Sequence, residues 1–283
     1  MVSVFYKENS LSLKHLLLVV PVLLVLLVLY LLPILRLFYS SFFDPTFTLK
    51  HYFYFFQNDL YIKILFRTFQ MALLVTAISL ILSYPVAAFL AEAKGKVQIL
   101  MICVVLPFWT SLLVRTYAWM VLLQANGLIN KYLLELGLVA EPVPLMYNTL
   151  GVLVGMVHVL LPFMILPIYS VLKSMDRDLV LAAYTLGANK FRAFWTVTFP
   201  LSLPGVSAGV IFVFVLSLGF FITPALLGGP KVTMIATLIE NQINELNNWS
   251  FAAAIALVLL TFTVLILGLF SKAVNFDRLG GKT

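Results

Sequence analysis

A polar segment, residues 173–204, separates two long apolar blocks and carries the most regular pattern of charged and small residues in the chain. Its marked positions are Lys173, Asp176, Arg177, Asp178, Ala182, Ala183, Gly187, Lys190, Arg192, Pro200 and Pro204. A polar segment of this length between two apolar blocks is best explained by a soluble partner that binds to it. We therefore interpret the segment as a docking handle.

Motifs for bond chemistry are missing from the sequence. It contains no His-Glu-x-x-His, no glycine-rich phosphate loop and no Gly-x-Ser-x-Gly. The single Cys103 excludes a disulfide framework and a multi-cysteine metal site. His158 lies in an apolar run, where we expect it to pack and to hydrogen-bond a neighbouring helix. The sequence therefore predicts no catalytic residue and no metal site, and it disfavours an intramembrane enzyme, which needs paired polar groups within its spans.

The amino-acid composition indicates a protein that lies in a lipid bilayer and not in water. Hydrophobic residues make up 63% of the 283 residues and charged residues 10%, and the mean hydropathy is +1.08. Too little polar surface remains to cover a soluble core, whereas a bilayer tolerates an apolar exterior. The net charge of +7 comes from basic residues scattered beside apolar runs, which is typical of membrane topology and not of nucleic-acid binding.

The apolar runs predict an all-α membrane protein with one transmembrane domain, residues 1–283, and six spans. The expected spans are about 15–38, 64–91, 98–123, 149–172, 203–227 and 251–271. No small-x-small cleavage site follows the first run, so we expect it to be retained as a span.

Basic residues predict the orientation. Most of the 18 Lys and Arg residues fall on the side of the N-terminus, and Lys94 and Lys96 flank a short turn on that side. Both termini and the polar segment are therefore predicted to be cytoplasmic. On the opposite side, residues 39–63 read as an aromatic interfacial segment. Residues 124–148 and 228–250 read either as a platform for an outer partner or as plain connecting loops.

Local signals inside the polar segment predict a helix–turn–helix. Asp178 or Ser174 can cap a short helix that begins near Leu179. Ala182 and Ala183 carry almost no side chain, so a partner can approach the backbone closely. Gly187 suits the end of this helix, and a second segment, 190–198, leads to Pro200. Such a rigid lever would tilt the spans on either side when pushed.

At these residues a resemblance becomes specific. The segment resembles the cytoplasmic coupling motif of ABC importer permeases, E-A-A-x3-G-x9-I-x-L-P. In this chain the motif positions are Leu181, Ala182, Ala183, Gly187, Val197, Phe199 and Pro200. Leu181 replaces the acidic residue, and Asp178, one turn earlier, is a candidate replacement for its charge. The resemblance assigns ATPase coupling to residues 173–202, and specifically to Asp178, Leu181, Ala182, Ala183, Gly187, Lys190 and Pro200.

Other stretches resemble spermidine/putrescine-type permeases, namely residues 106–111, 115–119, 126–130, 160–169 and 226–230. The resemblance implies a type I importer fold in the bacterial inner membrane, with a cytoplasmic coupling helix. It also implies four kinds of association: a second homologous permease, two ATPase subunits that hold ATP and Mg, a periplasmic binding protein and the lipid bilayer. No cofactor is expected on this chain.

The cargo path is less defined. No Asp or Glu lies in the middle of an expected span, so a cationic cargo would meet aromatic faces. The candidates are Trp109, Tyr117, Trp119, Phe220 and Phe221, with Arg115 for an anionic group and Glu240 at the outer mouth. The resemblance favours a polyamine, with opines, amino acids and other small organic solutes as alternatives. A stand-alone channel or secondary transporter is disfavoured because the two halves show no convincing inverted repeat.

Overall fold

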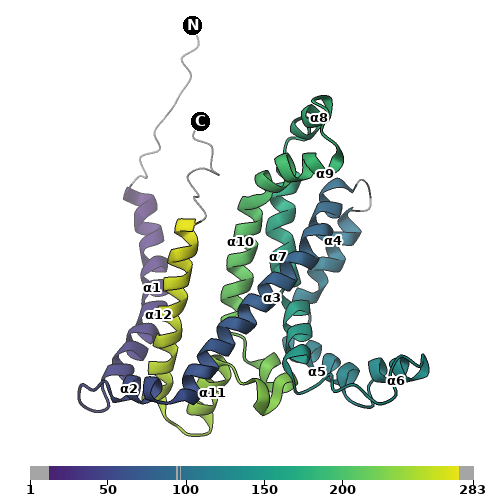
Figure 1. Ribbon diagram of the computed structural model, residues 1–283. Coiled ribbons are helices and arrows are strands. Elements are labelled where there is room, and N and C mark those ends of the chain that lie inside the picture. The colour runs from purple at the N-terminus through teal and green to yellow at the C-terminus, as the bar shows by residue number, and fades with distance from the viewer. Residues whose placement is uncertain (1–12, 94, 96, 274–283) are drawn as a thin grey trace.

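The computed structural model describes residues 13–93, 95 and 97–273, and the regular elements within them are all helical (Figure 1). Six segments are long and apolar enough to cross a bilayer. The predicted all-α membrane fold with six spans is confirmed. Lys94, Lys96 and both chain termini, which served to predict orientation, lie outside the described residues.

Five long helices run between the two ends of the molecule: α1 (Leu13–Phe42), α3 (Asp59–Glu92), α7 (Thr149–Ser174), α10 (Phe199–Leu218) and α12 (Trp249–Ala273). The short helices α8 (Arg177–Thr185) and α9 (Lys190–Ala193) lie at the end where α1 begins and α12 finishes (Figure 1, top). We call this the α8 end. The helices α2 (Lys50–Gln57), α6 (Leu128–Glu135) and α11 (Ile235–Asn244) lie at the opposite end, the α11 end.

Residues 98–123, the expected third span, do not form one continuous helix. They comprise α4 (Val97–Val105), a 3-10 turn (Leu106–Trp109) and α5 (Leu112–Leu123). Pro107 has no N–H for the helical ladder, and Thr110 and Ser111 both have extended ψ angles, 140° and 136°. The Thr110 hydroxyl donates to the Pro107 carbonyl at 2.9 Å, which satisfies part of the broken ladder.

The fifth span also differs from its expected bounds of 203–227. Helix α10 begins at Phe199, with Pro200 in its first turn, where a missing N–H costs nothing. It ends at Leu218, and residues 224–232 form a π-helical turn followed by a 3-10 turn before α11. The chain therefore leaves the bundle earlier than hydropathy predicts.

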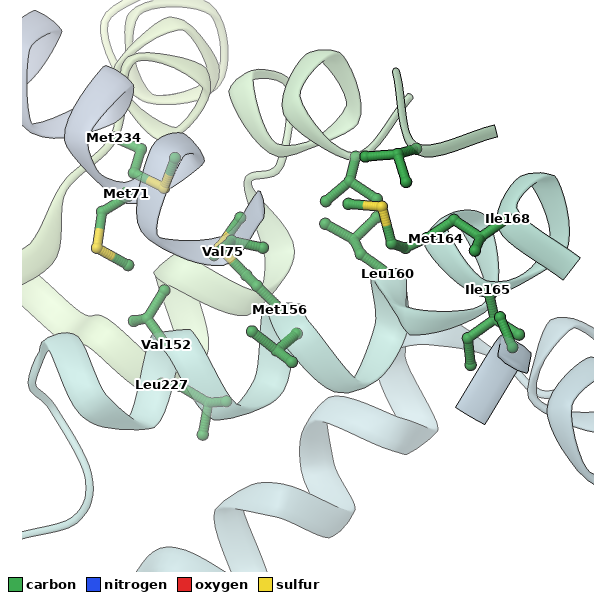
Figure 2. Packing of buried hydrophobic residues seen from close by; sticks show 14 of the residues in the cluster. Met71, Val75, Val152, Met156, Leu160, Met164, Ile165, Ile168, Leu227 and Met234 are labelled. Carbon is green, nitrogen blue, oxygen red and sulfur yellow. The ribbon is translucent and has the colours of Figure 1, made fainter. Parts of the chain in front are cut away.

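The main core lies between α3, α7 and α10. Buried side chains recur every fourth residue along α7, which places them on one face: Val152, Met156, Leu160, Met164 and Ile168. Figure 2 shows these side chains with Met71 and Val75 of α3 beside them. This face is the packed centre of the bundle.

Glycines bring α10 unusually close to α7. A Cβ on Gly205 would lie 2.7 Å from the Pro167 carbonyl oxygen, and a Cβ on Gly209 would lie 2.7 Å from the Met164 sulfur. The two glycines form a Gly-x-x-x-Gly pattern, which permits close helix approach in membranes. In lipid the hydrophobic effect does not drive helices together, so close packing stabilises the contact between α7 and α10.

A second cluster joins α2, α3, α11 and α12 at the α11 end, with Phe55, Tyr61 and Phe251 at its centre. Beside it, the Asp44 carboxylate lies 2.8 Å from Lys50 Nζ and 3.0 Å from His51 Nε2. The hydrogen bond from Lys50, and then that from His51, holds the pKa of Asp44 below its usual value. The aromatic segment expected to lie at the interface is in this way tied to the bundle.

Candidate functional site

The segment between α7 and α10 projects from the α8 end of the bundle (Figure 1). Helix α7 ends at Ser174, and Asp176 caps α8 by accepting a hydrogen bond from the Asp178 N–H at 2.9 Å. The cap was expected at Asp178 or Ser174, and that expectation is wrong. Ser174 bonds the Val171 carbonyl, and Asp178 lies inside the first turn, where its charge favours the helix dipole.

Gly187 ends α8 in a left-handed turn, with φ of +83°. Its N–H bonds the Tyr184 carbonyl, and the Ala188 N–H bonds the Ala183 carbonyl, both at 3.0 Å. This pair of bonds is the Schellman motif. The predicted role of Gly187 as a turn residue is confirmed, and the turn fixes the angle between α8 and α9.

The second limb of the segment packs on the bundle. Asn189 caps α9 by accepting from the Arg192 N–H at 2.8 Å, and residues 194–198 continue as a π-helical turn into Pro200. Phe194 meets the Tyr84 ring edge-on at 5.6 Å, and the Tyr84 hydroxyl lies 2.9 Å from Ser202 Oγ. These contacts tie the limb to α3 and α10.

Arg177 ties the first limb to α3. Its guanidinium donates to the carbonyl of Ala91, one residue before the end of α3, at 3.3 Å. A cation at a helix C-terminus is favourable because the unsatisfied carbonyls there carry partial negative charge. We name residues 175–198 the elbow. Arg177 and Phe194 hold it to the bundle at two separate points.

The outer surface of the elbow is apolar and uncovered. Helix α8 buries none of its residues, and Leu181, Leu186 and Phe191 are 56%, 88% and 74% exposed. Ala182, Lys190, Arg192 and Asp178 are also exposed, whereas Ala183 is half-buried. Large exposed apolar side chains among charged residues are typical of a protein contact site.

Sequence reasoning marked Asp176 and Arg177 only as charged residues of the segment and missed their roles as cap and anchor. It did not single out Leu186 and Phe191. The apolar residues Leu186 and Phe191 stand inside an otherwise polar segment, and that contrast was a usable signal. The Arg177 contact joins residues 86 positions apart, and no local pattern indicates it.

The residues expected along the cargo path do not gather in one place. Trp109 stands at the break after α4 and is 87% exposed. Tyr117 lines a cavity of about 570 Å³ beside residues 142–147 at the α11 end. Phe220 packs against the main core and Phe221 is exposed, both just after α10. Glu240, on α11, accepts from Asn244 at 3.0 Å.

Trp119 and Arg115 lie one turn apart on α5. The Trp119 indole N–H donates to His158 Nδ1 at 3.2 Å. The expected hydrogen bond between His158 and a neighbouring helix is confirmed, with His158 Nδ1 as the acceptor. Arg115 Nε is buried without a hydrogen-bond partner among the described residues. Within the same residues, no group of three or more His, Cys, Asp and Glu side chains is arranged to hold a metal.

Solved structures reproduce the fold. A chain of a bacterial alginate ABC transporter, crystallised with a periplasmic protein carrying an alginate pentasaccharide, superposes with a TM-score of 0.78, covering 99% of both chains at 16% identity. A second structure of an alginate ABC transporter gives a TM-score of 0.69 at 19% identity, covering 94% of this chain and 95% of that chain. At such identity the likeness establishes the fold alone.

Sequence relatives are closer. The spermidine/putrescine transport system permease protein PotB of Escherichia coli K12 is 36% identical over 235 residues, 83% of this chain and 85% of that protein. PotB of Haemophilus influenzae is 34% identical over 83% of this chain and 82% of its own. The E. coli inner membrane ABC transporter permease protein YdcU is 36% identical over 76% of this chain and 73% of its own.

Residues 10–275 match the family described as the binding-protein-dependent transport system inner membrane component. The match covers nearly the whole chain, including every described helix. The chain therefore belongs to this family of multi-pass inner-membrane permease subunits of ABC importers, which are not themselves enzymes.

Proposed function

We propose that the elbow is the surface on which an ATPase subunit docks and through which ATP-driven movement reaches the bundle. The observation that carries this is the uncovered apolar face at Leu181, Leu186 and Phe191 on a support fixed to the bundle. The spacing of Ala182, Ala183, Gly187 and Pro200, which matches the coupling motif, supports it further. On this proposal the coupling loop spans residues 173–202 of a single permease domain, 1–283.

Each proposed coupling residue has a physical role. Ala182 is small and exposed, so a groove on the ATPase can approach the α8 backbone. Gly187 sets the angle of the elbow, and Pro200 begins the helix that the elbow moves. Because Leu181 stands at the acidic position of the motif, Asp178 and Lys190, both exposed, supply the charges that meet the ATPase.

The proposed assembly contains a second homologous permease and two ATPase subunits that bind ATP and Mg. A periplasmic binding protein docks at the α11 end. The α8 end then faces the cytoplasm, with both termini on that side. Support for this orientation comes from the placement of the start of α1, the end of α12 and the elbow at the same end of the molecule (Figure 1).

Coupling requires that the elbow fit one ATPase arrangement better than another. A contact of equal strength in the open and closed ATPase dimers would shift nothing. The elbow is held to α3 and α10. When the ATPases close and move the elbow, both helices therefore move with it. The bundle then alternates between inward-open and outward-open states.

For the cargo we propose a polyamine, because two relatives that match 83% of this chain are named for spermidine and putrescine. Exposed aromatic faces at Trp109, Tyr117 and Phe221 are suited to a cation, and a second permease would enclose them. A carboxylate-bearing solute, such as an amino acid or opine, is the second candidate. The observation favouring it is the buried Nε of Arg115, which has no hydrogen-bond partner in the part of the chain that the structure describes.

Uptake into proteoliposomes that contain the assembled transporter and its binding protein separates the two candidates. We expect ATP-dependent uptake of labelled spermidine, with little uptake of a neutral amino acid. Arg115→Gln should leave polyamine uptake unchanged if the cargo is a cation. Loss of amino-acid uptake in that variant, with no spermidine uptake in the wild type, would contradict the polyamine assignment.

Docking is tested by replacing Leu186 and Phe191 together with Ala. Each truncation removes exposed apolar area that docking would bury, so we expect at least about tenfold weaker ATPase retention during purification. Replacing Leu265 and Leu269 of α12 together with Ala also truncates two exposed apolar side chains, 58% and 69% exposed, away from the elbow, and this variant should retain the ATPase. Equal retention in the two variants would contradict the docking surface.

A further inference from the structure

A groove of about 550 Å³ opens between α1, α11 and α12 at the α11 end, away from the elbow, and none of its lining residues was proposed for the cargo path. We call it the α1–α12 groove. Its walls are Pro33, Arg36, Leu37 and Ser40 of α1, Ile239 and Ile243 of α11, and Trp249, Ala252, Ala253 and Ala256 of α12.

Helical spacing explains why these residues share one hollow. The α1 residues follow an i, i+3, i+4, i+7 pattern, and the four α12 residues follow the same pattern, so each set forms one helix face. The three alanines leave room that larger side chains would fill. Packing of α1 against α12 closes the back of the hollow.

The groove is polar at its mouth and apolar in its depth. Helices α1 and α12 run in opposite directions (Figure 1). Of the groove residues on these helices, Ser40 and Trp249 are therefore nearest the α11 end, and Pro33 and Ala256 are farthest from it. Tryptophan is enriched at the level of lipid headgroups. An occupant of matching polarity has a polar head at the mouth and an apolar tail inside.

Arg36 supplies the charge. It is exposed and sits six residues before the end of α1, about 9 Å along the helix axis. None of the described residues forms a hydrogen bond or an ion pair with its guanidinium. A cation in a membrane span is costly unless an anion pairs with it, and guanidinium matches the geometry of a phosphate.

We propose that the α1–α12 groove binds an anionic phospholipid from the leaflet at the α11 end. The lipid phosphate pairs with Arg36 while Ser40 hydrogen-bonds the headgroup. One acyl chain lies against Ala252 and Ala256, with Ile239 and Ile243 covering its side. A protein helix in this place would have to bring an acidic side chain to the depth of Arg36, whereas an anionic lipid carries its charge at that level by itself.

The test uses the full chain with its accompanying subunits in nanodiscs of phosphatidylcholine, with or without phosphatidylglycerol. Phosphatidylglycerol retained after transfer to detergent is counted by mass spectrometry. We expect Arg36→Gln to retain about tenfold less, because a charge-assisted hydrogen bond is lost. Ala256→Leu, which fills the deep part of the groove, should also lose it.

Lys63→Gln is the matched control, since Lys63 is an exposed cation near the start of α3 at the same end. It should retain the lipid as the wild type does. Equal retention by Arg36→Gln and Lys63→Gln would overturn the proposal. A cross-link from the Ser40→Cys variant to a second permease subunit would also overturn it, because a protein segment would then occupy the groove.

Discussion

At the scale of single residues, the effect of replacing Gly187 depends on backbone conformation alone and not on packing. Its φ of +83° lies in the left-handed region, yet a Cβ there would meet no atom within 4 Å. Any cost of substitution therefore comes from the backbone conformation and not from a clash.

We expect Gly187→Val to uncouple ATP hydrolysis from uptake while membrane insertion stays normal. A β-branched residue in this conformation costs about 1–3 kcal/mol, so the turn and the elbow angle change. Gly187→Asn is the matched control, because Asn tolerates left-handed backbone. The measurement is the ratio of solute transported to ATP hydrolysed. A normal ratio in the valine variant would contradict the lever role.

Arg177 gives a second residue prediction, one that needs no partner subunit. Its bond to the Ala91 carbonyl is long and partly exposed, so we expect it to stabilise the elbow by about 1 kcal/mol. Arg177→Gln should raise amide hydrogen exchange in residues 177–186 about fivefold. Arg192→Gln, whose side chain has no partner among the described residues, should leave that exchange unchanged. Equal exchange in the two variants would show that Arg177 does not anchor α8.

These residues also show which features of the elbow can be predicted from local sequence. The left-handed glycine and the small Ala182–Ala183 pair were predictable because each depends on its immediate neighbours. The cap was misplaced by two residues because Ser174, Asp176 and Asp178 are all competent caps. The Arg177 anchor depends on where α3 ends in space, which no local pattern encodes.

At the scale of helices, the close contact between α7 and α10 holds the bundle together. Gly205→Ala would place a Cβ against the Pro167 carbonyl, a backbone atom that cannot move aside. We expect a loss of about 1–3 kcal/mol, measured as a lower thermal unfolding midpoint in detergent. Gly268→Ala is the control, because its Cβ would meet no atom within 4 Å. An unchanged midpoint for Gly205→Ala would contradict the close packing.

Hydropathy predicted the existence of the spans but not their ends. The break at Thr110 and Ser111 was missed because the few polar residues there do not interrupt the long apolar run from 98 to 123. Hydropathy also responds to polarity and not to φ and ψ. Pro107 marked the position, although membrane helices commonly tolerate proline. Helix α10 starts early because Pro200 is favourable in a first turn.

At the scale of the whole molecule, the two ends have different surfaces. The α8 end presents the elbow, and the α11 end presents α2, α6, α11 and two of the cavities. The expected cargo residues remain scattered in the single chain. A path formed between two permeases would be assembled only when the second subunit is present, so neither the sequence nor one chain brings those residues together.

Site-specific photo-cross-linking in the assembled transporter tests the docking of the elbow most directly. A photoreactive amino acid at position 186 should cross-link to the ATPase subunit, and the yield should change when ATP is bound. The same probe at position 136, where Leu136 is 71% exposed at the α11 end, should cross-link to the binding protein and never to the ATPase. No ATPase adduct at position 186, or an ATPase adduct at position 136, would contradict the coupling role of the elbow.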